Sequence, residues 1–350
     1  MIVDRKYWEE ISYKAGRKRR FETVDLVERM YVITSSQIRI KNHPVNRPRS
    51  VFNPSMKITE NGIRIYARVT LGYYTYASAV AEFDVSFEDL YSKRKKEFTA
   101  DLTILPSTRY DFWGVEDPRV YEIEGNTYVT YCGRTVSYFD SHIRVERTLP
   151  ITAVFRNGRW EKIAVFRMPD EIRSFVISDK NAFMVKAKDL LLFHRIHMLN
   201  EKFYLSVCKI PEGVLNLDHF EEVIVGDNIT VLEEQTDFEA KLGWATPPVR
   251  VNDEFLVLIH AVDKVMGVYR VFAVLMNDEG LFTAVTPFYI MEPREIYEIY
   301  GDRPYVVFPC GAGLKDGYLY ISYGGADSVV GIGRIKLDKL LEILYENRIE

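Results

Sequence analysis

A short motif recurs five times along the chain at nearly constant spacing. Each copy has a polar or small residue, often beside a proline, followed after about seven residues by a turn and a second apolar run. The copies are centred on Asn53, Asp117, Asn181, Pro247 and Pro309, which lie 64, 64, 66 and 62 residues apart. Five units of this length fill most of the chain.

The period of the repeat indicates the architecture. Four strands of about six residues, with their connections, need roughly this span. The repeats therefore predict an all-β fold, a five-bladed β-propeller in which each unit is one blade. The innermost strand of every blade lines one central channel, so equivalent positions of distant repeats meet at its axis. We expect functional residues at the repeated motif.

Composition is that of one large globular protein. Hydrophobic residues make up 47% and charged residues 27% of the 350 residues, and radial repeats allow a chain of this length to form a single body. The net charge of −4 argues against a nucleic-acid partner. The charged start of the chain and the lack of a long apolar run predict a cytoplasmic protein with no membrane partner. The three cysteines have neither paired nor metal-ligand spacing, and we expect all of them to be structural: Cys132, Cys208 and Cys310.

The two ends lie outside the repeats. We expect residues 1–45 to form an N-terminal extension with a helical segment, which the spacing places at residues 22–30. Its basic run at 14–20 is interpreted as solvated. Residues 46–335 are expected to form the propeller, and residues 336–350 a C-terminal helix with one apolar stripe. That helix either seals an edge of the propeller or docks on a second subunit, so a homo-oligomer is one open expectation.

The expected channel ends carry different polar residues in each repeat, as an asymmetric small-molecule site requires. Each residue alone is compatible with a turn or a surface salt bridge, but the set together favours a site. Its members are Asn53, Arg68, Asp117, Arg119, Lys180, Arg195, Lys241, His260 and Asp327.

Several of these residues lie in strings that resemble glycoside hydrolase family 130, which comprises β-mannoside phosphorylases and related β-mannosidases on a five-bladed propeller. The resemblance runs from about residue 53 to residue 327. Its strings are residues 114–119 (GVEDPR), His194-Arg195, Lys241 ahead of residues 246–248 (TPP), His260, residues 307–311 (VFPCG) and residues 323–327 (YGGAD).

The resemblance implies roles for individual residues. Asp117 corresponds to the family's proton donor, which acts through the 3-hydroxyl of the mannose being transferred. Asn53, Arg68 and Asp327 correspond to residues that hold this mannose, and Arg119 of the same motif joins the substrate-binding set. The phosphate pocket corresponds to Lys180, Arg195, Lys241 and His260, where position 180 matches by charge and register only.

The residue types favour phosphorolysis. Phosphate is already an anionic nucleophile and needs a cationic cradle to bind and aim it, whereas an inverting hydrolase needs a second carboxylate about 6.5–9.5 Å from the acid. We therefore predict inverting phosphorolysis of β-mannosides to α-mannose 1-phosphate and a released sugar. The partners are then a carbohydrate and inorganic phosphate as co-substrate, with no cofactor and no metal.

Two other functions stay open. A β-mannosidase could use Asp327 or Glu239 as its base, and a non-catalytic sugar-binding propeller would lack turnover altogether. A metal site at His194-x-x-His197 is disfavoured because residues three apart on a strand point to opposite faces. The linkage and the released sugar depend on loops whose shape the sequence does not give.

Overall fold

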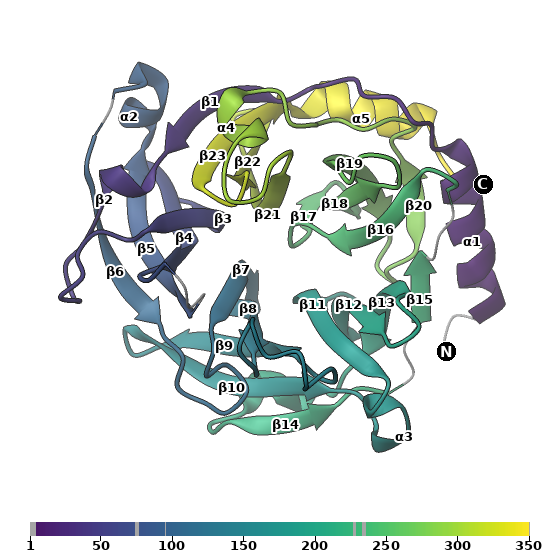
Figure 1. Cartoon of the computed structure of the whole chain (residues 1–350). Helices are drawn as coiled ribbons and strands as arrows, with labels where there is room; N and C mark the ends of the chain where they lie inside the picture. The colour runs from purple at the N-terminus through teal and green to yellow at the C-terminus, as the bar shows by residue number, and fades with distance from the viewer. Residues whose placement is uncertain (1–4, 74–76, 95, 227–228, 233–235, 350) are drawn as a thin grey trace.

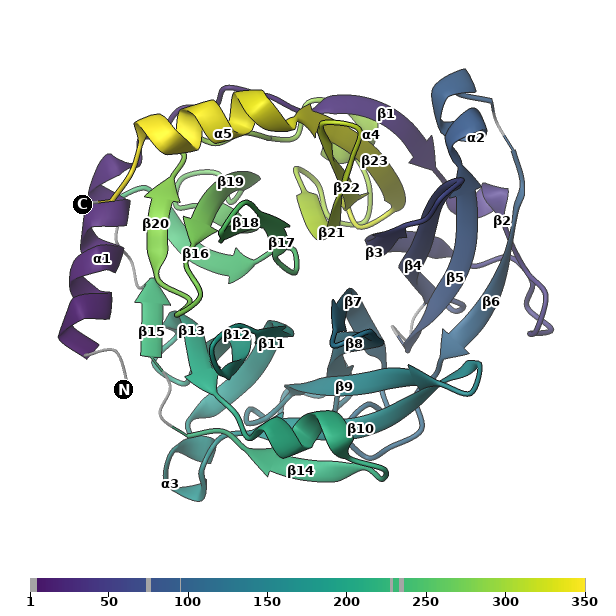
Figure 2. The same ribbon diagram turned by 180° about the vertical axis from the view of Figure 1, so that it is seen from behind.

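The computed structural model describes residues 5–73, 77–94, 96–226, 229–232 and 236–349. Five separate sheets surround one central channel, and Figures 1 and 2 show this ring from its two sides. The five-bladed β-propeller that the repeat predicts is therefore confirmed.

Each blade is built outward from the channel. Blade 1 contains β3 (Ser50–Ile58), β4 (Gly62–Thr70), β5 (Ser78–Ser86), β6 (Phe98–Ile104) and β2 (Ile38–Ile40). Blade 2 contains β7 (Val115–Ile123), β8 (Asn126–Arg134), β9 (Thr148–Arg156), β10 (Arg159–Arg167) and β14 (Glu221–Ile224). Blade 3 contains β11 (Val176–Lys186), β12 (Leu190–Met198), β13 (Phe203–Lys209) and β15 (Ile229–Leu232).

Blades 4 and 5 complete the ring. In blade 4 the inner position is shared by β16 (Glu239–Trp244) and β17 (Val249–Val251), followed by β18 (Glu254–Asp263), β19 (Tyr269–Met276) and β20 (Phe282–Val285). Blade 5 contains β21 (Val307–Lys315), β22 (Tyr318–Gly325), β23 (Val329–Lys336) and β1 (Glu28–Ile33). The helical segments are α1 (Arg5–Lys18), α2 (Phe87–Ser92), α3 (Asp170–Arg173), α4 (Ile296–Ile299) and α5 (Leu337–Glu346), with 3-10 turns at Ser35–Gln37 and Glu212–Asn216.

The start of the chain closes the ring. Strand β1 pairs antiparallel with β23, so that the outermost strand of the last blade comes from the N-terminus. Strand β2 likewise runs beside β6 as the outer strand of blade 1. The first 45 residues thus supply strands to two blades, and the apolar side chains of these two strands, Ile33 among them, lie in the core.

The prediction of a helix at residues 22–30 is wrong. This stretch is extended: Thr23 forms a bridge with Tyr289, and the backbone N–H groups of Val24 and Leu26 each donate to a carbonyl of residues 289–290 at 2.9 Å. Pairing with this neighbouring segment supplies hydrogen-bond partners for the backbone N–H and C=O groups, so helical hydrogen bonds are not needed. The N-terminal helix is α1, which buries Ile11 against blades 3 and 4.

The C-terminal helix is present as α5. Its apolar stripe, including the fully buried Leu340 and Leu344, packs on β19, β20 and β23 of its own chain. The helix thus seals the edges of blades 4 and 5, while association with a second subunit stays a prediction. No helix in the described part of the chain is both long and apolar enough to cross a membrane.

The repeated motif coincides with a break in the inner strands. The pairing register shifts between Phe52 and Ser55 in β3, and equivalent shifts occur in β7 and β11. Inside these bulges Asn53, Asp117 and Asn181 have φ of 45°, 48° and 56°. Asn and Asp tolerate this left-handed conformation better than most residues, and a bulge turns its side chain out of the alternation of the strand. Three blades thereby place a polar side chain at equivalent points of the channel.

Candidate active site

Two glycines make room for the bulge residues. A Cβ at Gly324 of blade 5 would lie 2.0 Å from Asn53 Oδ1, and a Cβ at Gly243 of blade 4 would lie 2.8 Å from Asn181 Oδ1. Neighbouring blades therefore approach each other closely at the channel. Both amide oxygens are buried against the neighbouring blade and have no hydrogen-bond partner among the described residues.

Asp117 lies in a polar contact between blades 1 and 2. Its Oδ1 accepts from Asn53 Nδ2 at 2.8 Å and from Arg68 Nη1 at 3.1 Å. Arg68 is held in turn by Ser78, to whose hydroxyl its Nε donates at 3.1 Å. The side chain of Asp117 is 11% exposed, so its remaining oxygen can meet a substrate in the channel.

Glu116, directly before Asp117, is fully buried and joins four polar side chains. Its Oε1 accepts from Arg134 Nε at 2.7 Å and from the Tyr138 hydroxyl at 2.8 Å, and lies 3.1 Å from Arg68 Nη2. Its Oε2 accepts from Lys180 Nζ at 3.1 Å. Burial would raise the pKa of this carboxyl, but the charges of Arg68, Lys180 and Arg134 hold it well below its usual range.

Asp327 enters the same region from blade 5. It is half-buried at the end of β22 and, like the bulge residues, has a positive φ, of 51°. Burial and the nearby charge of Asp117 raise the pKa of Asp327 to about 6, against the opposing effect of Arg68 and Arg303. The sequence-predicted residues Asn53, Arg68, Asp117 and Asp327 are thus brought together.

A second group of side chains, from blades 3 and 4, is cationic. The Arg195 guanidinium and the Lys241 ammonium lie 5.3 Å and 5.4 Å from the centroid of one ring, that of Phe203. Neither forms an ion pair with any described residue, and Arg195 Nε is buried without a partner there. Uncompensated buried charge is unfavourable unless an anion balances it.

His260 lies beside these cations. Its ring is fully buried between Tyr269 and Phe308, at centroid distances of 5.8 Å and 4.6 Å. Burial, followed by the charges of Arg195 and Arg119, lowers its pKa well below the ordinary value. The imidazole is therefore neutral at neutral pH. Both its ring nitrogens have no partner among the described residues, so one N–H is available to donate to a ligand.

Arg303 is a further cation that the sequence did not single out. It lies in the segment between α4 and β21, exposed, with its guanidinium 4.7 Å from the Tyr269 ring centroid. Lys241 lies 5.4 Å from the same centroid. The pKa of Lys241 is lowered to about 7 by burial and then by the charges of Arg195, Arg303 and Lys180. These four cations therefore form one electrostatic unit.

This lowered pKa leads to a prediction about anion binding. Lys241 is charged below pH 7 and loses its charge above it, so affinity for sulfate should fall by up to about tenfold per pH unit above 7. Calorimetric titration with sulfate between pH 6 and 9 measures this, because sulfate itself does not titrate there. Lys241→Arg should remove the dependence. A wild-type affinity that stays constant over this range would contradict the prediction.

Arg119 has a different position from the other predicted site residues. It is 1% exposed, and its guanidinium donates at 3.0 Å to the carbonyls of Ala245, Trp244 and Asp117. It therefore links blade 2 to blade 4 across the channel and fixes the backbone at Asp117. Contact between Arg119 and a substrate stays a prediction.

Two other candidates lie away from this site. Glu239, the alternative base, accepts from Arg19 Nη2 at 2.9 Å and from the Tyr289 hydroxyl at 2.7 Å, in the interface between the N-terminal segment and blade 4. His194 pairs with Asp179 at 2.7 Å, whereas His197 pairs with Glu201 at 3.0 Å. The two histidines thus have separate acidic partners.

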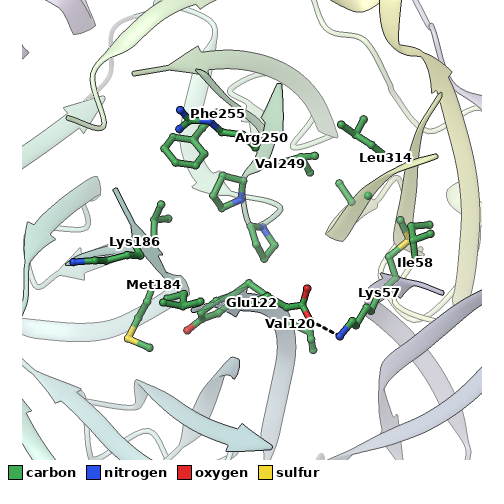
Figure 3. A pocket seen from close by; sticks show the side chains of 18 of the residues that line it. Lys57, Ile58, Val120, Glu122, Met184, Lys186, Val249, Arg250, Phe255 and Leu314 are labelled. Atoms are coloured by element: carbon green, nitrogen blue, oxygen red, sulfur yellow. Dashed lines mark hydrogen bonds and ion pairs between the residues drawn. The ribbon is translucent and has the colours of Figure 1, made fainter. Parts of the chain in front are cut away.

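The opposite end of the channel holds a cavity of about 540 Å³. It is lined by the later residues of the inner strands, mostly apolar, together with a Lys57–Glu122 ion pair (Figure 3). Its lysines and its arginine each have an acidic partner, and it lacks the bulge residues. The candidate site is therefore the polar end of the channel. Arg119 lies between this end and the cavity.

The residues missed by sequence reasoning are Glu116, Asn181, Tyr138, Tyr269 and Arg303. A signal was present for two of them. Glu116 belongs to the string that carries Asp117, and Asn181 is the centre of the third repeat. The other three lie outside the repeated inner strands, so the period of the repeat does not indicate their positions: Tyr138, Tyr269 and Arg303.

Comparison with known proteins identifies the family and agrees with the fold. The family model of glycoside hydrolase family 130, described as beta-1,4-mannooligosaccharide phosphorylase, matches residues 17–346. A 1,2-beta-oligomannan phosphorylase of Thermoanaerobacter sp. (strain X514) is 26% identical over 321 residues, which cover 85% of this chain and 97% of that protein.

Solved structures share the architecture. The beta-1,2-mannobiose phosphorylase from Listeria innocua, in complex with beta-1,2-mannobiose, aligns with a TM-score of 0.69 at 16% identity, covering 92% of this chain and 99% of its own. A structure from the same family, reported to contain hydrolases that target beta-1,2 mannosidic linkages in Candida mannan, aligns with a TM-score of 0.60 at 16% identity, covering 82% and 84%.

Proposed function

Because this chain belongs to glycoside hydrolase family 130, we propose that it is a β-mannoside phosphorylase. It cleaves a β-mannoside with inorganic phosphate and releases α-mannose 1-phosphate and a free sugar. The observation that carries this proposal is a group of three cations beside the neutral His260, none of which forms an ion pair within the described part of the chain: Arg195, Lys241 and Arg303. Such a group suits an oxyanion with several acceptors.

In this proposal Asp117 is the general acid. It protonates the leaving oxygen by relay through the 3-hydroxyl of the mannose. Asn53 and Arg68 fix the orientation of the Asp117 carboxylate. Asp327 holds the mannose from the blade 5 side. Phosphate lies among the cations of blades 3 and 4 and attacks the anomeric carbon from the face opposite the leaving group, which inverts the configuration. The cations reduce the repulsion between phosphate and the carboxylates.

The arrangement of carboxylates supports phosphate rather than water as the nucleophile. Glu116 is held by three cations and Glu239 by Arg19, so neither has a free oxygen pair to activate water. Among the carboxylates that the structure describes at this end of the channel, Asp327 is the remaining candidate base. It lies near Asp117 rather than among the cations, on the side assigned to the sugar.

The test is product analysis with β-1,2- and β-1,4-mannobiose, with and without phosphate. We expect cleavage to require phosphate and to yield α-mannose 1-phosphate. The product is identified by the one-bond coupling between its anomeric carbon and proton and by phosphorus NMR. Release of free mannose at an equal rate in phosphate-free buffer would instead establish a β-mannosidase that uses Asp327. Binding of mannosides without turnover in either buffer would establish a sugar-binding propeller.

We also propose that the enzyme acts in the cytoplasm. All three cysteines are free and buried, which suits a reducing compartment. The reaction is proposed to need no metal or organic cofactor, since phosphate supplies the nucleophile and Asp117 the proton.

A further inference from the structure

Glu116 connects the two halves of the proposed site. Through Oε1 it contacts Arg68, which itself donates to Asp117 at 3.1 Å. Through Oε2 it accepts from Lys180, the cation of blade 3 nearest to it, at 3.1 Å. One fully buried carboxylate therefore touches both the group that orients the acid and a member of the cationic group.

Lys180 differs from the other cations because it has a carboxylate partner. Arg195 and Lys241 have no ion pair with any described residue, whereas Lys180 is neutralised by Glu116. An ammonium has three donors, so Lys180 can keep its bond to Glu116 and still donate to an anion in the channel. Its position toward that anion is then set by Glu116, because a flexible four-carbon stem does not fix an ammonium by itself.

We propose that Glu116 is a positioning residue that fixes the distance between the acid and the bound phosphate, acting through Arg68 on one side and Lys180 on the other. The proposal rests on phosphorolysis as the function of the site. Glu116 itself does not touch the reacting atoms. Arg134 and Tyr138, which also bond its Oε1, hold the carboxylate in one orientation.

The primary test is Glu116→Gln, which keeps the shape and removes the charge. We expect turnover to fall by about 100-fold, as for a displacement of about 1 Å of reacting groups, and the Michaelis constant for phosphate to rise by about tenfold. Glu239→Gln is the matched control, because Glu239 is also a buried, arginine-paired carboxylate but lies at the N-terminal interface. It should lower the melting temperature and leave both kinetic constants unchanged.

A double-mutant cycle separates positioning from a merely structural role. Lys180→Met should raise the phosphate Michaelis constant in the wild-type background and have little further effect in Glu116→Gln, since both remove the same arrangement. If Glu116→Gln does not fold, Glu116→Asp, which retains the charge and withdraws it by one methylene, takes its place in the cycle.

Two results would overturn the proposal. Kinetic constants for Glu116→Gln like those of the Glu239→Gln control would show that the carboxylate only stabilises the fold. Effects of Glu116 and Lys180 that simply multiply would show that the two act independently. Failure of the underlying function is recognised separately, because the wild-type enzyme would then release free mannose in phosphate-free buffer.

Discussion

Asp117→Asn is expected to lower turnover of a natural β-mannoside by about 10²–10⁴-fold, the usual contribution of a general acid. The amide keeps the shape of the side chain and can still accept from Asn53 and Arg68, but it cannot deliver the relayed proton. Circular dichroism and the dissociation constant for the mannoside should stay close to wild type. Steady-state phosphorolysis with quantified mannose 1-phosphate measures the loss.

Two controls make this result specific to proton transfer. A mannoside with a dinitrophenolate leaving group needs no protonation, so Asp117→Asn should cleave it far better, relative to wild type, than it cleaves mannobiose. Asp111→Asn replaces another buried aspartate, in the segment that leads into β7. Asp111 is paired with Lys162 away from the channel residues, so this variant should leave turnover unchanged. Retention of more than about a tenth of wild-type turnover in Asp117→Asn would remove Asp117 from this role.

Arg195→Ala should raise the Michaelis constant for phosphate by about 10–100-fold and that for the mannoside by far less. A hydrogen bond to a charged group contributes about 1.5–3 kcal/mol, which corresponds to that range. Arg195 is buried beside Lys241 with no ion pair of its own among the described residues, so its removal leaves no internal partner unpaired. The fold should therefore tolerate the change.

Lys57→Ala is the matched control for this prediction. Lys57 lies at the other mouth of the same channel, paired with Glu122 (Figure 3). Initial rates with each substrate varied in turn should show no change in either Michaelis constant for this variant. Equal increases in both constants for Arg195→Ala would mean that Arg195 supports the whole site rather than the phosphate.

The repeat predicted the fold because its period is a property of the local backbone. Asn53, Asp117 and Asn181 recur where the inner strands of blades 1 to 3 bulge, and a left-handed bulge favours Asn or Asp at each of these places. The sequence therefore located both the blades and the residues of three bulges. It centred the third repeat on Asn181 but assigned a role only to the preceding Lys180, whereas in the structure Asn181 occupies the bulge and Lys180 is paired with Glu116.

Other features depend on contacts that no periodicity records. The extended conformation of residues 22–30 arises from pairing with residues 289–290 and with β23, more than two hundred positions away. Arg303 reaches the site from a long connection between blades, and Arg119 donates to carbonyls of blade 4 rather than facing the channel alone. In each case tertiary partners determine the conformation, so the residue type alone was insufficient.

The pairing of β1 with β23 has a consequence during synthesis on the ribosome. Glu28 and Arg334, which meet through a 2.7 Å ion pair, are 306 residues apart. At about 5–20 residues per second, some 15–60 s pass between the emergence of these two strands. Blades 1 to 4 can form in that interval, but the edge of β1 waits unpaired, and the blade that supplies Asp327 forms last. The candidate site of a nascent chain is therefore incomplete until β23 has left the ribosome, and a ribosome that stalls before β23 yields a protein without a finished fifth blade.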